Sequence, residues 1–296
     1  MSTWIWLTLM AAVAQAFRSA GQKKLSEHVS VWGTTFARYA FALPLVWLYF
    51  MAQLNWQDAE LPAISSTFLW YSLGTALAQI AATAFVVKLF QLRNFAIGII
   101  YSKSEAVLVA VLGVLIFSQI LSGAGWISVL LGVVGLMFLN PPGKQKGFRA
   151  LFSASAGIGL ASGFCFALTT LWARQASLSL GADPIVTSAY TLSVSISMQV
   201  VILGSYILFK EPETLRKLAQ RWQLSSGVGV LSLVGSIGWF TAFSLQNPAL
   251  VKTLGQVEFF FALILSTRLF KESHSVREYC GMALLLASVI LLLWLA

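Results

Sequence analysis

Apolar residues run through this chain in long blocks separated by short polar or turn-rich stretches. The blocks are continuous over about 20 residues and do not alternate at every second position, a pattern typical of membrane-spanning helices rather than barrel strands. We expect ten spans, at about residues 3–22, 31–52, 66–91, 95–117, 121–140, 150–177, 184–209, 224–246, 249–270 and 276–296.

Composition agrees with this pattern, because 58% of the residues are hydrophobic, only 10% are charged and the mean hydropathy is +0.82. An average soluble domain carries about 25% charged residues. Ten helices of about 21 residues use about 210 positions and leave no room for a separate extramembrane domain. We therefore expect an all-α integral membrane protein and exclude a tethered enzyme or a receptor ectodomain.

The second half of the chain repeats the first at a constant offset. Glu105 falls on Glu258 (258 − 105 = 153), and the same shift brings Asn94 onto Asn247. Since each half holds five spans, an odd number, the second half enters the membrane from the opposite side, as in the inverted repeats of many secondary transporters. A duplicated bundle with no transport role is the alternative. The units that follow are a first five-helix repeat at 1–143, a cytoplasmic connection at 144–152 and a second five-helix repeat at 153–296.

Basic residues gather in the odd-numbered connections, which indicates the orientation. They are Lys23, Lys24, Arg93, Lys144, Lys146, Arg149, Lys210, Arg216, Lys217, Arg221, Lys271 and Arg277. Lysine and arginine favour cytoplasmic loops, so we expect the odd connections inside and both termini outside, in the bacterial inner membrane. The same bias accounts for the net charge of +9, so we expect no nucleic-acid partner. Binding of these loops to anionic lipid headgroups is compatible with this orientation.

Charged residues within the apolar blocks are the first candidates for function, because charge at bilayer depth costs several kcal/mol and needs a partner. They are Arg38, Lys88, Lys103, Glu105, Lys252 and Glu258. Lys88, Arg93 and Lys252 lie near helix ends, where a long side chain can extend to the interface. For these three we expect an interfacial position without a function.

Glu105 and Glu258 lie well inside their blocks, at equivalent depths in the two repeats. A carboxylate in a weakly hydrated cavity holds a proton more readily than one in water. We expect Glu258, and with it Glu105, to bind a cationic substrate group or to exchange a proton. The alternative is a structural pair in which Lys103 or Arg38 neutralises Glu105, although Lys103 is two residues away and points elsewhere on a helix.

Uncharged polar and aromatic side chains could line a cavity around the two acids. Each alone fits an interhelical hydrogen bond or a packing role equally well, so only the set carries weight. The residues expected to bind substrate or protons are Glu258, Glu105, Gln256, Tyr101, Lys103, Arg38, Tyr39, Gln79, Trp239 and Gln15, with Thr83, Trp172 and Tyr190 as further cavity residues.

The same motif occurs in both halves, as Glu258-Phe259 followed by an apolar run to Glu272, and as Glu105-Ala106 followed by an apolar run to Gln119. In this pattern the chain resembles the ten-helix EamA-type members of the drug/metabolite transporter superfamily over essentially its whole length. The resemblance implies export of amino acids, related metabolites or drugs through a cavity lined by helices 1–4 and 6–9, with helices 5 and 10 peripheral. Phe259 and Ala106 stand where the family often has proline, which argues against a helix break at either position.

Other function classes find little support. The chain has no Gly-x-x-x-x-Gly-Lys-Ser/Thr loop for ATP and no metal-ligand spacing, so we expect no cofactor. A membrane-embedded enzyme would need a nucleophile with a base, and Ser102 and Ser104 have no histidine nearby in sequence. A passive channel would need a symmetric pore.

The sequence therefore predicts a secondary transporter, a monomer or weak homodimer in the lipid bilayer, that exports a small organic solute such as an amino acid. A multidrug or organic-cation exporter is the alternative within the same fold. Facilitated diffusion and proton coupling both remain open.

Overall fold

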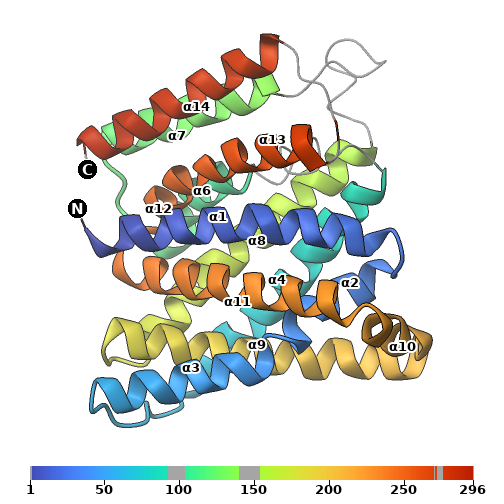
Figure 1. The fold of residues 1–296 in the computed structure, drawn as a ribbon. Coiled ribbons are helices and arrows are strands. Elements are labelled where there is room, and N and C mark those ends of the chain that lie inside the picture. Colours follow the sequence, from blue (N-terminus) through green and yellow to red (C-terminus); the bar gives the residue numbers. More distant parts are fainter. Residues whose placement is uncertain (1, 93–103, 140–153, 270, 272–275, 296) are drawn as a thin grey trace.

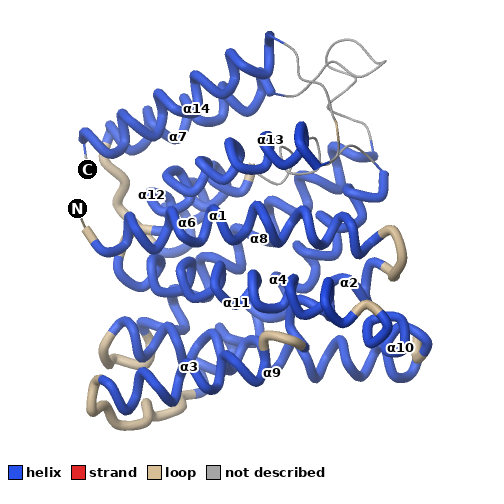
Figure 2. Tube along the Cα trace, viewed as in Figure 1, coloured by secondary structure: helices blue, strands red, loops and turns tan. Residues whose placement is uncertain are grey.

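The computed structural model describes residues 2–92, 104–139, 154–269, 271 and 276–295. All regular structure among them is helical (Figure 2). In chain order the helices are α1 (Thr3–Ser26), α2 (Val31–Ala40), α3 (Leu43–Trp56), α4 (Ser66–Leu92), α6 (Glu105–Phe117), α7 (Gly123–Leu139), α8 (Ala154–Leu178), α9 (Pro184–Lys210), α10 (Glu213–Gln220), α11 (Trp222–Leu245), α12 (Pro248–Leu254), α13 (Glu258–Leu269) and α14 (Val276–Leu295). A 3₁₀ turn at Gly255–Val257 joins α12 to α13.

Helices occur in all of the blocks that the sequence predicted. In the described part, five helical stretches are long and apolar enough to cross a membrane: Val31–Trp56, Ser66–Leu92, Pro184–Lys210, Trp222–Leu245 and Pro248–Leu269. Helices α1 and α8 are also long, with 24 and 25 residues. The all-helical membrane class is confirmed at this level.

The second stretch, Val31–Trp56, is not one straight helix. The α-helix is interrupted at Phe41 and Ala42, and α3 begins with Pro44 in its first turn. Proline has no backbone N–H, so a helix start suits it and a helix interior does not. Gly229 of α11 packs against this break, since a Cβ there would lie 2.4 Å from the Phe41 Cβ.

Helix contacts follow a pairwise order across the two halves. Helix α1 packs along α11, α4 packs along α8, α7 pairs with α14, and α3 pairs with α9. When 153 is added to the residue numbers, α1 falls on α8, α4 on α11, α3 within α9 and α7 on α14. The contact of α1 with α11 is therefore the counterpart of the contact of α8 with α4, and the contacts α7–α14 and α3–α9 are each their own counterpart. Counterpart helices thus have counterpart neighbours.

Figure 1 shows how these pairs are arranged. Helices α7 and α14 lie side by side along one edge, α3 and α9 lie along the opposite edge, and α1, α8, α4 and α11 run between them. The two chain termini lie at one end of the bundle and α10 lies at the other. The middle of the molecule is therefore formed by α1, α4, α8 and α11, together with α2, α6 and the α12–α13 pair.

Small residues let α1 and α11 approach closely. A Cβ on Gly238 would lie 2.6 Å from the Leu7 carbonyl oxygen and 2.8 Å from the Ala11 Cβ, and Gly235 faces Ala11 and Ala14 at 3.7 Å. Backbone atoms cannot swing aside as a flexible side chain can. In lipid, where tails are as apolar as leucine, such close packing is a main source of helix association.

Replacing Gly238 with alanine should therefore push α1 away from α11. Gly227, on the same helix, provides the control, because nothing lies within 4 Å of a Cβ built there. We expect Gly238→Ala to lose roughly 1–3 kcal/mol of stability through overpacking, while Gly227→Ala is neutral or slightly stabilising. Thermal unfolding of the detergent-solubilised protein measures both. Equal midpoints for the two variants would contradict the close crossing.

Candidate functional site

Glu258 occupies the first position of α13, directly after an interruption of the helix. Helix α12 ends at Leu254, and Gly255–Val257 form a 3₁₀ turn. Trp239 of α11 packs onto this turn, since a Cβ on Gly255 would lie 2.3 Å from the indole Cη2. Helix α13 is continuous through Phe259, as the absence of proline there predicted. The interruption lies earlier, at Gly255–Val257, where Gly255 leaves space for the Trp239 ring.

Glu105 occupies the equivalent position in the other half, as the first residue of α6. Its Oε1 lies 2.7 Å from the Lys252 Nζ of α12 and accepts a hydrogen bond of 3.0 Å from the Thr170 hydroxyl of α8. The side chains of Lys252 and Glu105 are only 10% and 8% exposed. The expected interfacial position of Lys252 was therefore wrong. Among the described residues, the cation that neutralises Glu105 is not Arg38 but Lys252 from the other half of the chain.

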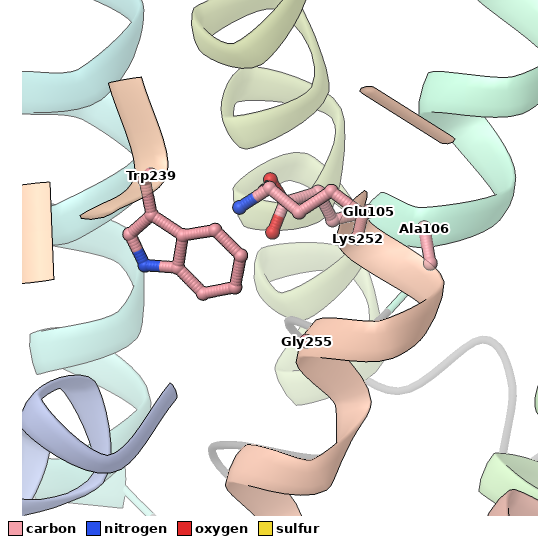
Figure 3. A pocket seen from close by; sticks show the side chains of 5 residues that line it. All are labelled: Glu105, Ala106, Trp239, Lys252 and Gly255. Carbon is pink, nitrogen blue, oxygen red and sulfur yellow. Dashed lines mark ion pairs between the residues drawn. The ribbon is translucent and has the colours of Figure 1, made fainter. Parts of the chain in front are cut away.

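Aromatic rings cover the ammonium of this ion pair. The Lys252 Nζ lies 4.2 Å from the Trp239 ring centroid and 5.2 Å from that of Phe243, and the two rings stack with centroids 5.8 Å apart. Figure 3 shows the indole facing the Lys252 ammonium beside the Glu105 carboxylate. Cation–π attraction is strongest where water is excluded, so the rings help to offset the desolvation of Lys252.

Gln15 of α1 connects this group to the second acid. The Trp239 Nε1 donates to the Gln15 Oε1 at 2.8 Å, and the Gln15 Nε2 donates to the Glu258 Oε2 at 2.6 Å. An indole N–H can only donate and an ionised carboxylate can only accept, which fixes the orientation of the amide. A continuous chain of contacts thus runs from Glu105 through Lys252, Trp239 and Gln15 to Glu258. We call these five residues the central chain.

A cavity of about 20 Å³ lies along the central chain. This is room for about one water molecule. Its lining includes Gln15, Arg38, Gln79, Glu105, Trp239 and Lys252. Side chains therefore nearly fill the centre in this conformation, and a larger solute can enter only if the surrounding helices move apart.

Arg38 and its neighbours form the wall opposite α11 and α12. The Arg38 Nη1 donates to the Thr83 hydroxyl at 2.8 Å, and the Tyr39 hydroxyl donates to the Gln79 carbonyl at 3.2 Å. The Gln79 Oε1 accepts from Gln199 of α9 at 2.7 Å. These bonds connect α2, α4 and α9 beside the cavity.

The structure gathers most of the predicted site residues. Gln15, Arg38, Gln79, Glu105 and Trp239 line the cavity, and Glu258 is bonded to Gln15. Tyr39 is 1% exposed and packs beside them. Tyr101 and Lys103 lie outside the described residues.

Gln256 is turned away from the central chain. A Cβ on Gly132 of α7 would lie 2.8 Å from both amide atoms of Gln256 and 3.1 Å from the Ser288 hydroxyl of α14. Its side chain thus points to the peripheral pair α7 and α14, two residues before Glu258 on the chain but on the opposite side. This position corresponds to packing between helices, and we no longer include Gln256 in the site.

Sequence reasoning missed three residues near the two acids: Lys252, Thr170 and Arg18. Arg18 is 4% exposed and lies one turn after Gln15 on α1, a spacing of three that could have indicated a shared face. Thr170 has no such signal, because its partner is distant in sequence. The described residues contain no group of three or more metal-ligating side chains.

Residues 154–294, from α8 to α14, match the EamA-like transporter family, part of the drug/metabolite transporter superfamily. The chain carries an EamA-like transporter domain. The predicted resemblance is thereby confirmed, and it points to a membrane transporter rather than an enzyme.

The fold of the entire chain also has a counterpart of known structure. A protein crystal structure aligns with 98% of this chain and 99% of its own length, with a TM-score of 0.67 and 15% sequence identity. At that identity the likeness concerns the fold alone, but it includes the first half of the chain, which the family match does not cover.

Removing the Lys252 charge should leave Glu105 as a buried, uncompensated carboxylate. We expect Lys252→Met to lose about 3 kcal/mol of stability, and Lys252→Met combined with Glu105→Gln to recover most of it, as measured by thermal unfolding in detergent. Lys88→Met is the matched control, because Lys88 is exposed. If adding Glu105→Gln brings no recovery, the loss does not come from the unpaired carboxylate.

Proposed function

We propose that this chain is a secondary transporter that exports a small organic solute, an amino acid or a related metabolite, by alternating access. The central chain carries this proposal. It joins Glu105 and Glu258, one from each half, across the middle of helices long enough to span a bilayer. Buried ionisable groups at such depth are costly to maintain and typically mark solute or proton pathways.

We further propose that the two halves form an inverted repeat of five spans each. Three observations support this: α6 and α13 begin at Glu105 and Glu258, 153 residues apart; helix contacts exchange under the same shift; and both termini lie at one end of the bundle. Repeats of this kind rock against each other around a site at their interface. The central chain spans that interface, because Gln15 and Glu105 come from the first half and Lys252, Trp239 and Glu258 from the second.

Glu258 is the proposed ligand for a substrate amine or a proton. Its hydrogen bond with Gln15 comes from a neutral amide, which an incoming ammonium group can replace with a charge-assisted bond of greater strength. The 3₁₀ turn before Glu258 supplies a weak point in the α12–α13 pair. A small change in backbone angles there would separate the two segments and enlarge the cavity.

Uptake into proteoliposomes tests the function directly. The purified chain should move one or more members of a panel of amino acids, amines and organic anions, with and without a pH gradient. We expect Glu258→Gln to slow transport at least tenfold and to remove any dependence on the pH gradient, because glutamine can neither bind an ammonium as an ion pair nor release a proton. Lys88→Met is the control.

The panel also separates the proposal from its competitors. Transport of organic cations in place of amino acids would assign the chain to multidrug export. A wild-type rate and unchanged pH dependence for Glu258→Gln would remove Glu258 from the mechanism. Absence of movement for every compound would contradict the transport proposal as a whole.

We propose that the chain lies in the inner membrane with α10 in the cytoplasm and both termini outside. The basic residues Lys210, Arg216, Lys217 and Arg221 flank or lie within α10, at the end of the bundle opposite the termini. Lysine and arginine on one side of the membrane favour the cytoplasmic side.

Cysteine labelling of intact cells tests this orientation. In a background with Cys165 and Cys280 replaced by serine, Lys217→Cys should resist an impermeant thiol reagent and Ala63→Cys should react, because the two exposed positions lie in connections of opposite parity. Permeabilised cells should label both. The reverse pattern would invert the proposed topology.

A further inference from the structure

Among the described residues, two buried arginines near the central chain form no direct ion pair. Arg18 of α1 and Arg38 of α2 are 4% and 3% exposed. In the described part of the chain, Arg38 makes one side-chain hydrogen bond, to Thr83, and contacts the Tyr39 ring at 5.3 Å. The buried Nε of Arg18 has no hydrogen-bond partner among the described residues.

The small number of acidic side chains explains why these arginines form no ion pair. Two acidic side chains lie outside the described part of the chain: Glu272, just before α14 in the sequence, and Glu278, near the start of α14. Among the described residues the buried acids are Glu105 and Glu258, and Glu105 is paired with Lys252. The centre thus holds three cationic side chains, those of Arg18, Arg38 and Lys252, against two carboxylates.

Both arginines lie near the cavity. Arg38 lines it, and Arg18 lies one turn from Gln15, which also lines it. Arg18 interacts electrostatically with Arg38 and with the carboxylates of Glu258 and Glu105. Two like charges held together in an apolar bundle repel each other, and an unsatisfied guanidinium there is costly.

Further donors without partners lie on the same helix faces. Gln22 follows Arg18 by one turn on α1, and Thr34 precedes Arg38 by one turn on α2. Both side chains are at most 1% exposed, and the Gln22 Nε2 and the Thr34 Oγ1 have no hydrogen-bond partner in the described part of the chain. Helices α1 and α2 are in contact. The interface between them is therefore rich in positive charge and in unused polar groups.

We propose that Arg18 and Arg38 bind the carboxylate of the transported solute. This inference rests on the proposed transport function and narrows its substrate class to compounds with a carboxylate, and to zwitterions where Glu258 binds the amine. A guanidinium presents paired N–H donors that match the two oxygens of a carboxylate. One bound carboxylate supplies the negative charge that the centre lacks and accepts hydrogen bonds from both arginines.

Three sets of matched probes separate the two ends of the solute. Each set shares a side chain: L-leucine, L-leucinamide and 4-methylpentanoate; L-phenylalanine, L-phenylalaninamide and 3-phenylpropanoate; L-threonine, L-threoninamide and 3-hydroxybutanoate. In each set the first compound carries both the amine and the carboxylate, the second carries the amine alone, and the third carries the carboxylate alone. Half-saturation constants are measured by uptake or competition in proteoliposomes that contain the full chain, and binding is measured in parallel as the shift in thermal unfolding.

We expect wild-type protein to prefer the amino acid over its amide at least tenfold in at least one set. Arg18→Met and Arg38→Met should abolish this preference by raising the half-saturation constant for the amino acid at least tenfold, with little change for the amide. Glu258→Gln should instead weaken binding of the amide relative to binding of the carboxylate-only compound. Lys88→Met, which removes an exposed cation from α4, should keep the wild-type pattern.

The ratio between amino acid and amide is independent of the amount of folded protein, so partly unstable variants remain informative. Arg18→Gln and Arg18→Lys replace the methionine variant if it does not fold; the first should lose the preference and the second retain part of it. An unchanged ratio in the Arg18 and Arg38 variants, or equal wild-type affinity for amino acids and amides, would overturn the carboxylate site while leaving transport intact. If wild-type protein moves and binds none of the nine compounds, the proposed function for this substrate class fails together with the site.

Discussion

The structure depends on the need of five buried charged side chains to satisfy one another inside helices that are otherwise apolar. A charge in hydrocarbon costs several kcal/mol, so Arg18, Arg38, Glu105, Lys252 and Glu258 all face the interior. The ion pair between Lys252 and Glu105 meets part of this requirement, and the amide of Gln15 meets another part at Glu258. Because the partners come from both halves of the chain, the same contacts that neutralise the charges hold the halves together.

This constraint explains why the helices that carry the buried charges and their partners occupy the middle. Helices α1 and α8 carry glutamine, arginine and threonine side chains, and they pack along α11 and α4, whereas α7 and α14 contact each other at one edge. Close packing there depends on small residues. At Gly74 of α4 a Cβ would lie 2.8 Å from the Trp172 ring of α8, and Gly238 has the corresponding role between α11 and α1. The polar centre and the close helix crossings are thus both formed by α1, α4, α8 and α11.

The sequence was sufficient for the helical class, the helix positions and the two acids, because long apolar blocks and rare buried charges are local signals. It failed for Lys252, whose position near the start of a helix suggested the interface although its partner Glu105 lies in the other half. It also failed for Gln256, since residues two apart on a helix face different ways and only packing decides which side is the cavity. The break before Glu258 requires a glycine and a distant tryptophan together, a combination that no single stretch of sequence contains.

The two halves share their acids but not the partners of those acids. Residues 153 positions away from Lys252 and Gln15 are Ile99 and Leu168, so neither partner has a polar counterpart in the other half. Glu105 is bonded to a lysine whose charge is covered by two aromatic rings, while Glu258 accepts a bond from an amide that carries no charge. Displacing the lysine leaves two buried charges without this contact, whereas displacing the amide affects the charge of the carboxylate alone. The contact between Lys252 and Glu105 is therefore the more costly of the two to break, which suits it to hold the halves together, and the contact between Gln15 and Glu258 is the one that breaks at lower cost.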